Sequence, residues 1–204
     1  MTFKKIKHEA DLPIFVKKLD NLFIPDLLNF FKNTHKIEKN KILAGNIKEE
    51  YDMLNFTPRF EKELYEDIFN NKELKKIIHS KAPLKKYTLS IEEFWINIQK
   101  KHEFNPLHNH YGLFSFNIFI QVPFLKEEEY VNSPGFKGNN NLAGCLQFVY
   151  TTPLGSLNTF NIAMDKTLEG IILLFPSELF HQVYPFYTSD KDRITAAGNI
   201  YFKR

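Results

Sequence analysis

The sequence predicts a mostly β protein of the α+β class, in which a helical N-terminal part precedes a strand-rich C-terminal part. Before residue 87, apolar residues recur at helical spacing, whereas from there to residue 204 short alternating or continuous apolar segments follow one another. The helices come before the strands and do not alternate with them. We therefore expect an antiparallel sandwich or barrel braced by helices.

The helical part contains two stretches with helical periodicity. Residues 22–31 place large apolar side chains on one broad stripe around Pro25. Thr57-Pro58 is typical of a helix start, with a hydroxyl at the N-cap and proline at the first helical position. The pattern then continues through residues 60–78 until Pro83. Residues 41–53 interrupt it and are expected to form a loop or an edge segment.

The C-terminal part is expected to contain strands at residues 94–99, 114–121, 146–152, 159–163, 171–175 and 194–202. Residues 114–121 alternate between a face of large apolar side chains and a mainly polar face that includes Ser115 and Asn117. If the sheet closes on itself, the polar face lines a cavity for a small ligand; an open sheet would expose it to solvent. The Gly/Asn-rich residues 127–144 are expected to form a long loop, either a lid or a variable surface segment.

Composition excludes several classes of protein. The 204 residues are 43% hydrophobic and 25% charged with a net charge of +3, which is ordinary for a globular protein and far from the basic excess of dedicated nucleic-acid binders. No apolar run is long enough to span a membrane, and residues 1–15 lack the apolar core of a secretory signal. Cys145 is the single cysteine, so no internal disulfide or zinc-thiolate site is expected. We expect a cytoplasmic protein, of the cell or of a host cell if viral.

Lysines are concentrated in residues 72–86, where Glu73 is the single acidic residue. A solvated helix face followed by a loop is the expected structure. Binding of an anionic partner is the alternative, but no interleaved aromatic side chains support it.

Three histidines in the strand-rich part form a candidate metal site. His108 and His110 are two residues apart, so in an extended segment both imidazoles point to the same side. Neutral imidazoles are suited to divalent first-row metals. His181 follows a buried apolar segment and a Pro-Ser turn, where it can supply a third ligand. An ordinary loop histidine is the alternative interpretation.

Arg193 begins the last predicted strand, which is otherwise largely apolar. A buried arginine needs an anion, and a carboxylate is its natural bidentate partner. Thr195 points to the same side of the strand and can add a hydroxyl donor. A metal, a guanidinium and a hydroxyl together would form a site for a small chelating acid.

The segments HNHYGLFSFNIFIQVP, FPSELFHQVYPF and RITAAGNI resemble the 2-oxoglutarate- and Fe(II)-dependent oxygenases, and most closely a branch frequent in phage and marine bacterial genomes. The resemblance extends over residues 91–202, with weaker similarity at LAGNIKEEYDM. It implies a double-stranded β-helix, a jelly-roll-like barrel. Residues 87–204 would then form the catalytic core and residues 1–86 a mainly helical support region, within one domain of residues 1–204.

The resemblance further implies that His108 and His181 ligate Fe(II), and that Arg193, helped by Thr195, binds the distal carboxylate of 2-oxoglutarate. Most of the superfamily has a carboxylate where this chain has His110. Three hypotheses remain: His110 is the third ligand, a carboxylate such as Asp165 replaces it, or water or substrate does.

The implied reaction is O2-dependent hydroxylation of a peptide side chain or a small molecule, with release of succinate and CO2. Desaturation would use the same chemistry. The reaction is centred on iron, so no separate acid or base residue is expected. Asn97, Ser115 and Asn117 are expected to line the cavity and contact the cosubstrate.

Two other kinds of protein fit part of the pattern. A cupin-type metal protein could use three histidines without 2-oxoglutarate, but it would not need Arg193, and Glu178 stands where the cupin motif has glycine. A non-catalytic jelly-roll module would bind no metal and would leave His110 and His181 as ordinary surface residues.

Overall fold

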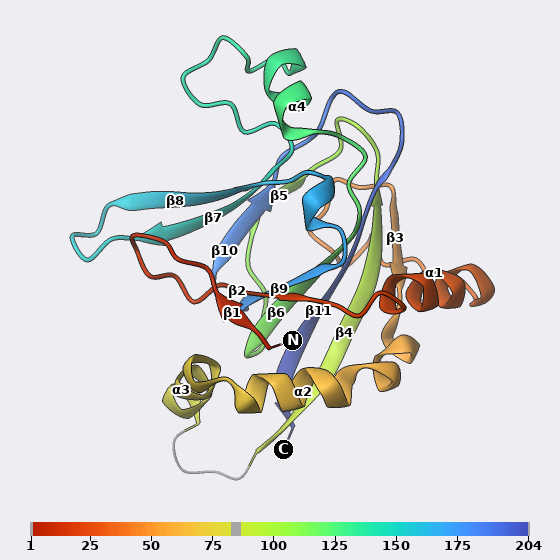
Figure 1. Ribbon diagram of the computed structural model, residues 1–204, viewed down its shortest axis with the longest axis vertical. Helices are drawn as coiled ribbons and strands as arrows, with labels where there is room; N and C mark the ends of the chain where they lie inside the picture. The colour runs from red at the N-terminus through yellow and green to blue at the C-terminus, as the bar shows by residue number, and fades with distance from the viewer. Residues whose placement is uncertain (1, 83–86, 204) are drawn as a thin grey trace.

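Two antiparallel sheets form the frame of the protein in the computed structural model, which describes residues 2–82 and 87–203 (Figure 1). The larger sheet has the strand order β1-β2-β9-β6-β11-β4-β3, and the smaller has the order β5-β10-β7-β8. All pairings between these strands are antiparallel. The strands are β1 (Lys4–Lys5), β2 (Phe15–Lys18), β3 (Glu49–Asp52), β4 (Thr88–Gln99), β5 (Asn105–His108), β6 (Phe114–Gln121), β7 (Cys145–Thr151), β8 (Leu157–Ala163), β9 (Ile171–Pro176), β10 (Phe180–Val183) and β11 (Arg193–Lys203).

The helices are α1 (Phe23–Asn33), α2 (Glu61–Asn70), α3 (Lys72–Lys81) and α4 (Lys126–Asn132), with the 3-10 helices η1 (Leu54–Arg59) and η2 (Lys166–Leu168). Apolar side chains of α1, α2 and α3 form one buried cluster with those of the larger sheet. The helix α4 lies at the opposite end of the molecule from α2 and α3 (Figure 1). Within the described part of the chain, none of the helices combines the length and apolar character needed to cross a membrane.

Strand β6 shows how the sequence pattern sorts side chains between two environments. Its bounds agree with the predicted residues 114–121. Phe114 and Ile118 belong to the cluster that contains the helices, while Ser115 and Asn117 line a cavity bounded by residues of both sheets. Ser115 is buried and Asn117 half-buried, so this part of the polar face lines a cavity and does not lie on the open surface.

Neighbouring strands bring further polar side chains into register on this inner face of the larger sheet. Thr195 of β11 lies opposite Asn97 of β4, which lies opposite Glu50 of β3. Arg193, the first residue of β11, is paired with Gln99, the last residue of β4. Paired residues on adjacent strands point to the same face. The register therefore gathers polar side chains from separate strands on one face, where those of β4 and β11 line the cavity.

The start of α2 differs from the sequence prediction. Thr57 is not an N-cap, because it lies within η1 and its hydroxyl donates to the carbonyl of Leu54 at 2.9 Å. The helix α2 begins after it, at Glu61. Proline is tolerated here because it stands inside a short 3-10 helix and not in the interior of an α-helix.

The periodic pattern of residues 60–78 is divided between two helices. Asn71 has an extended conformation, and its side chain accepts hydrogen bonds from two backbone N–H groups of the first turn of α3. An asparagine in this position caps a helix and so ends one helix and starts the next. Pro83, Lys85 and Lys86, which the sequence analysis included, lie outside the described residues.

The N-terminal residues also supply strands to both edges of the larger sheet. Strands β1 and β2 extend the edge beside β9, and β3 extends the other edge beside β4. The sequence predicts neither β5 nor β10, because strands of four residues are too short to show a clear alternation. The long loop expected at residues 127–144 includes most of helix α4.

Candidate functional site

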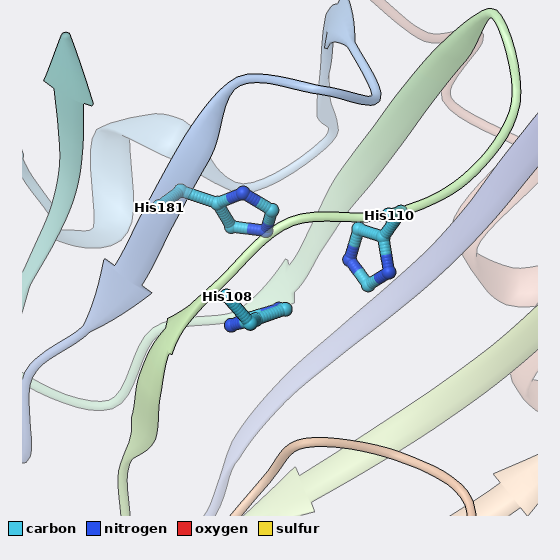
Figure 2. Close-up of side chains that lie close together, drawn as sticks. All are labelled: His108, His110 and His181. Atoms are coloured by element: carbon cyan, nitrogen blue, oxygen red, sulfur yellow. The ribbon is translucent and has the colours of Figure 1, made fainter.

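Three histidine side chains converge on one side of the smaller sheet (Figure 2). His108, the last residue of β5, is paired with His181 of β10. His110 follows β5 by two residues, at the start of the loop to β6. Potential ligand nitrogens of the three rings all lie within 4.8 Å of one another.

Backbone carbonyls orient two of the three rings. Nδ1 of His108 lies 2.7 Å from the carbonyl oxygen of Pro106, and Nδ1 of His181 lies 3.0 Å from that of Leu179. Because a carbonyl oxygen can only accept a hydrogen bond, each Nδ1 carries the hydrogen and each Nε2 has a free lone pair. This is the usual arrangement of a metal-ligating histidine.

Burial keeps the three imidazoles neutral. It lowers the pKa of His108, that of His110 to about 4 and that of His181 to about 3. Positive charge on neighbouring histidines lowers the pKa of His110 and His181 further. Only the neutral imidazole can bind a metal. At neutral pH the cluster is therefore in the form that fits Fe(II), with a donor set of three nitrogens.

The alternative ligand Asp165 is not part of this cluster. Its carboxylate accepts hydrogen bonds from the backbone N–H and the hydroxyl of Thr167 and caps the 3-10 helix η2. Among the described residues, the group of side chains able to share a metal consists of histidines alone.

Arg193 reaches the same cavity and is buried, with 2% of its surface exposed. Nη2 of its guanidinium donates to Oε1 of Gln99, and the guanidinium carbon lies 5.8 Å from the centre of the Phe186 ring. Within residues 2–82 and 87–203, no carboxylate forms an ion pair with it. Burial lowers the pKa of Arg193 to about 9, so the group still carries a positive charge at neutral pH.

All residues predicted from the sequence to form the site line this cavity, which opens to solvent. Nδ2 of Asn97 donates to the Thr195 hydroxyl at 3.3 Å, and Oδ1 of Asn97 accepts from the Trp95 indole at 3.0 Å. The Ser115 hydroxyl contacts the side chains of Ser177 and Asn199. The lining includes His108, His110, His181, Arg193, Thr195, Asn97, Ser115 and Asn117.

The sequence analysis missed several residues of the wall. Gln99 contacts the guanidinium directly, and the Sδ atom of Met164 lies 3.8 Å from Nη1 of Arg193. Alternation along β4 could have placed Gln99 on the same face as Asn97. Nothing in the local pattern could have paired it with Arg193, which is far away in the sequence.

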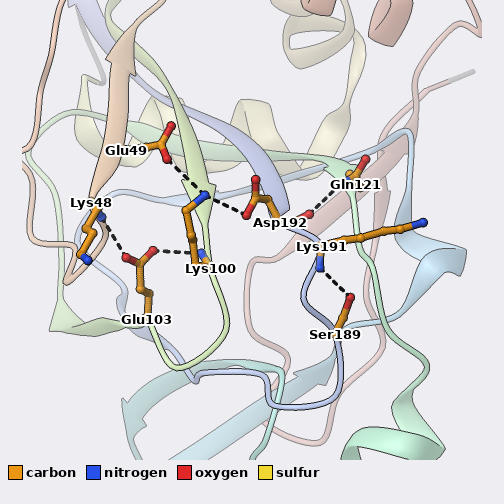
Figure 3. A network of polar contacts seen from close by, with 8 residues as sticks. All are labelled: Lys48, Glu49, Lys100, Glu103, Gln121, Ser189, Lys191 and Asp192. Atoms are coloured by element: carbon orange, nitrogen blue, oxygen red, sulfur yellow. Dashed lines mark hydrogen bonds and ion pairs between the residues drawn. The ribbon is translucent and has the colours of Figure 1, made fainter.

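A network of polar contacts fixes the start of β11 next to Arg193 (Figure 3). Nζ of Lys100 lies 3.1 Å from carboxylate oxygens of both Asp192 and Glu49. Nε2 of Gln121 donates to the backbone carbonyl of Asp192 at 2.6 Å. These contacts tie β11 to β4, β3 and β6 at the residue that precedes Arg193.

Comparison with known proteins identifies the family. The sequence model of the family described as "Putative 2OG-Fe(II) oxygenase" matches residues 93–199, which is more than half of the chain. The chain therefore belongs to this family of oxygenases, whose cofactor is Fe(II) and whose cosubstrates are 2-oxoglutarate and O2. No curated protein sequence matches the chain.

Solved structures show the same fold. A prolyl-4-hydroxylase from Pseudomonas putida superimposes with a TM-score of 0.51 at 10% identity, over 94% of this chain and 92% of that chain. The α-ketoglutarate-dependent epimerase SnoN of nogalamycin biosynthesis gives a TM-score of 0.50 at 9% identity, over 92% and 76% of the two chains. At such low identity these similarities establish the double-stranded β-helix fold alone. Family membership does not favour the cupin or the non-catalytic jelly-roll alternative.

Proposed function

We propose that His108, His110 and His181 hold Fe(II), and that Arg193, with Thr195, binds the distal carboxylate of 2-oxoglutarate. One observation carries this assignment: a buried guanidinium that forms no ion pair with any described carboxylate shares a cavity with three neutral imidazoles. A buried charge is costly unless an opposite charge compensates it. A keto diacid can supply that charge and still reach the histidines with its other end.

The protein's own residues set the position of the cosubstrate before any chemistry occurs. Gln99 holds Nη2 of Arg193, which leaves the remaining guanidinium donors for a carboxylate. Fixing one end of the keto acid in this way restricts the orientation of the other end. Bound Fe(II) supplies the activation of O2 and the oxidative decarboxylation of 2-oxoglutarate to succinate and CO2.

Charge favours the same ligand. Three neutral imidazoles add no negative charge to the site, whereas the usual pair of histidines with a carboxylate adds one. A dianionic keto acid should therefore be attracted more strongly here than to a site with a carboxylate ligand. His110 is accordingly the third ligand in our proposal.

The prime substrate is, in this proposal, a peptide side chain or a small molecule that is hydroxylated. Trp95 and the amides Asn105 and Asn117 line the cavity besides the residues assigned above. Such a wall suits a substrate with neutral polar groups. We further propose that residues 87–204 form the catalytic core and that residues 1–86 support it within a single domain.

Anaerobic addition of Fe(II) and 2-oxoglutarate tests the assignment through the visible absorption band that a chelated keto acid gives with iron. We expect Arg193→Met to bind Fe(II) but to show no band at 2-oxoglutarate concentrations that saturate the wild type. Arg59→Met is the matched control, because Arg59 forms a half-exposed ion pair with Asp26 away from the cavity. A full band in Arg193→Met at the same concentrations would contradict the proposal.

A further inference from the structure

His110 is positioned differently from the other two histidines of the cluster. Backbone carbonyls two residues earlier hold the rings of His108 and His181. The imidazole of His110 makes no hydrogen bond within the described part of the chain. Its backbone N–H donates to the carbonyl of Ser177 at 2.9 Å. The place of this ring therefore depends on its packing beside the Trp95 ring, 5.8 Å away between ring centres, and on where the main chain holds residue 110.

Ser177 is itself held by a chain of side-chain hydrogen bonds that crosses the larger sheet. Its hydroxyl lies 3.0 Å from that of Ser115, which lies 2.7 Å from Oδ1 of Asn199. Nδ2 of Asn199 donates to the exposed carboxylate of Glu93 at 2.5 Å. Ser115, Asn199 and Ser177 are each at most 3% exposed, so water does not compete for the links between them.

The donor and acceptor properties of the side chains fix the direction of each hydrogen bond in this series. The carboxylate of Glu93 can only accept, so Asn199 presents its amide nitrogen to Glu93 and its oxygen to Ser115. Ser115 must then donate to Asn199, which leaves its own oxygen to accept from the hydroxyl of Ser177. Glu93, Asn199 and Ser115 occupy paired positions on β4, β11 and β6. The links from Glu93 to Asn199 and from Asn199 to Ser115 are therefore set by the sheet register.

We propose that Ser115, Asn199 and Ser177 are positioning residues for the third metal ligand. The inference rests on the proposed function, in which His110 ligates the metal. The side-chain hydrogen bonds, together with the bond from the backbone N–H of Ser177 to the carbonyl of Leu113, hold Ser177 in place. The carbonyl of Ser177 in turn holds the main chain at His110. Because no hydrogen bond orients the His110 ring, loosening this chain should displace the imidazole from the other two.

Anaerobic titration of the full-length protein with Co(II), followed by the visible absorption of the bound ion, tests this proposal. Ser115→Ala and Ser177→Ala each remove one hydroxyl of the chain. We expect the Co(II) dissociation constant to rise about tenfold in each, the lower end of the loss caused by removing an outer-shell partner.

Thr57→Val is the matched control, because it removes a buried hydroxyl hydrogen bond in η1, outside the cavity. Its thermal midpoint should fall by a few degrees, like those of the serine variants, while its Co(II) affinity should stay at the wild-type value. Unchanged Co(II) affinity in both serine variants would overturn the proposal. A loss in Thr57→Val as large as in Ser115→Ala would also overturn it.

A double-mutant cycle with His110→Ala separates positioning from general loosening of the fold. If Ser115 acts through His110, Ser115→Ala should weaken Co(II) binding much less in the His110→Ala background than in the wild type. Equal losses in both backgrounds would refute the proposal.

If His110→Ala binds Co(II) too weakly to titrate, the Co(II) spectrum of Ser115→Ala decides. A weaker or shifted band supports the proposal, and a wild-type band contradicts it. A wild-type protein that binds no Co(II) would overturn the metal assignment as well.

Discussion

Replacing Arg193 with methionine should stabilise the ligand-free protein, although it removes the proposed cosubstrate contact. Burial lowers the pKa of Arg193 to about 9, although the charge of Glu129 partly opposes this shift. At about 1.4 kcal/mol per pH unit, the lowered pKa corresponds to a cost of about 5 kcal/mol to the folded state. Since the folded-state pKa is lowered, this cost is fully present below pH 9 and is lost as the pH rises above it.

Methionine removes this charge while keeping a long side chain in the cavity wall. It also removes the hydrogen bond to Oε1 of Gln99, and leaving that buried acceptor without a donor should cost about 1–2 kcal/mol. The free energy of unfolding of Arg193→Met at pH 7 should therefore exceed that of the wild type by about 3 kcal/mol.

Urea unfolding at pH 7, without metal or cosubstrate, measures the expected gain in the free energy of unfolding of Arg193→Met. Arg59→Met serves as the control and should stay within about 1 kcal/mol of the wild type, because it breaks a half-exposed ion pair. Adding Co(II) and 2-oxoglutarate under nitrogen should raise the wild-type midpoint above that with Co(II) alone, through ligand binding to the folded state. Arg193→Met should show no such additional rise.

Two outcomes would refute this reasoning. If ligand-free Arg193→Met is less stable than the wild type, other groups of the folded protein already balance the charge of the guanidinium. The guanidinium would then not require a bound anion. If 2-oxoglutarate stabilises Arg193→Met as much as the wild type, the cosubstrate carboxylate binds elsewhere.

The histidines should differ in their contributions to metal binding. Backbone carbonyls hold the rings of His108 and His181, so His108→Ala and His181→Ala should each lower Co(II) affinity by more than about 100-fold. His110→Ala should lower it least. A Co(II) titration that gives the opposite order would contradict this prediction. Burial, and after it the charge of Glu103, raises the pKa of Glu50 to about 7, so ionising Glu50 destabilises the folded state progressively as the pH rises from 4.5 to 7. Glu50→Gln should match the wild type at pH 4 and exceed its free energy of unfolding by up to about 3 kcal/mol at pH 8, and parallel urea-unfolding profiles across this pH range would disprove it.

Much of the site could be predicted because the relevant patterns are local. His108 and His110 are two residues apart in nearly extended chain, and Thr195 follows Arg193 by two residues in a strand. A repeat of two residues puts both members of such a pair on one face, whatever the rest of the fold does. The same repeat predicted β6 and the separation of its two faces.

Helix boundaries were harder to predict because competing local conformations have similar energies. The Thr57-Pro58 pair is typical of an α-helix start, but the chain forms a 3-10 helix there. The Thr57 hydroxyl donates a hydrogen bond to the carbonyl of Leu54, three residues earlier. The break at Asn71 depends on a side chain that is favoured at a helix N-cap and unfavourable inside a helix, a signal that the apolar periodicity on both sides of it obscures. Packing against the larger sheet selects between such alternatives.

The sequence by itself determined which residues could carry the chemistry and on which side of its own strand each one lies. Only the tertiary structure decided that His181 pairs with His108, that Gln99 meets Arg193, and that Ser177 supports His110. The physical reason is that strand register between segments far apart in sequence is set by burial of the whole sheet, which no local pattern encodes. Whether a buried charge has a partner depends on that register too, so only the folded chain showed that the Arg193 guanidinium forms no ion pair with a described carboxylate.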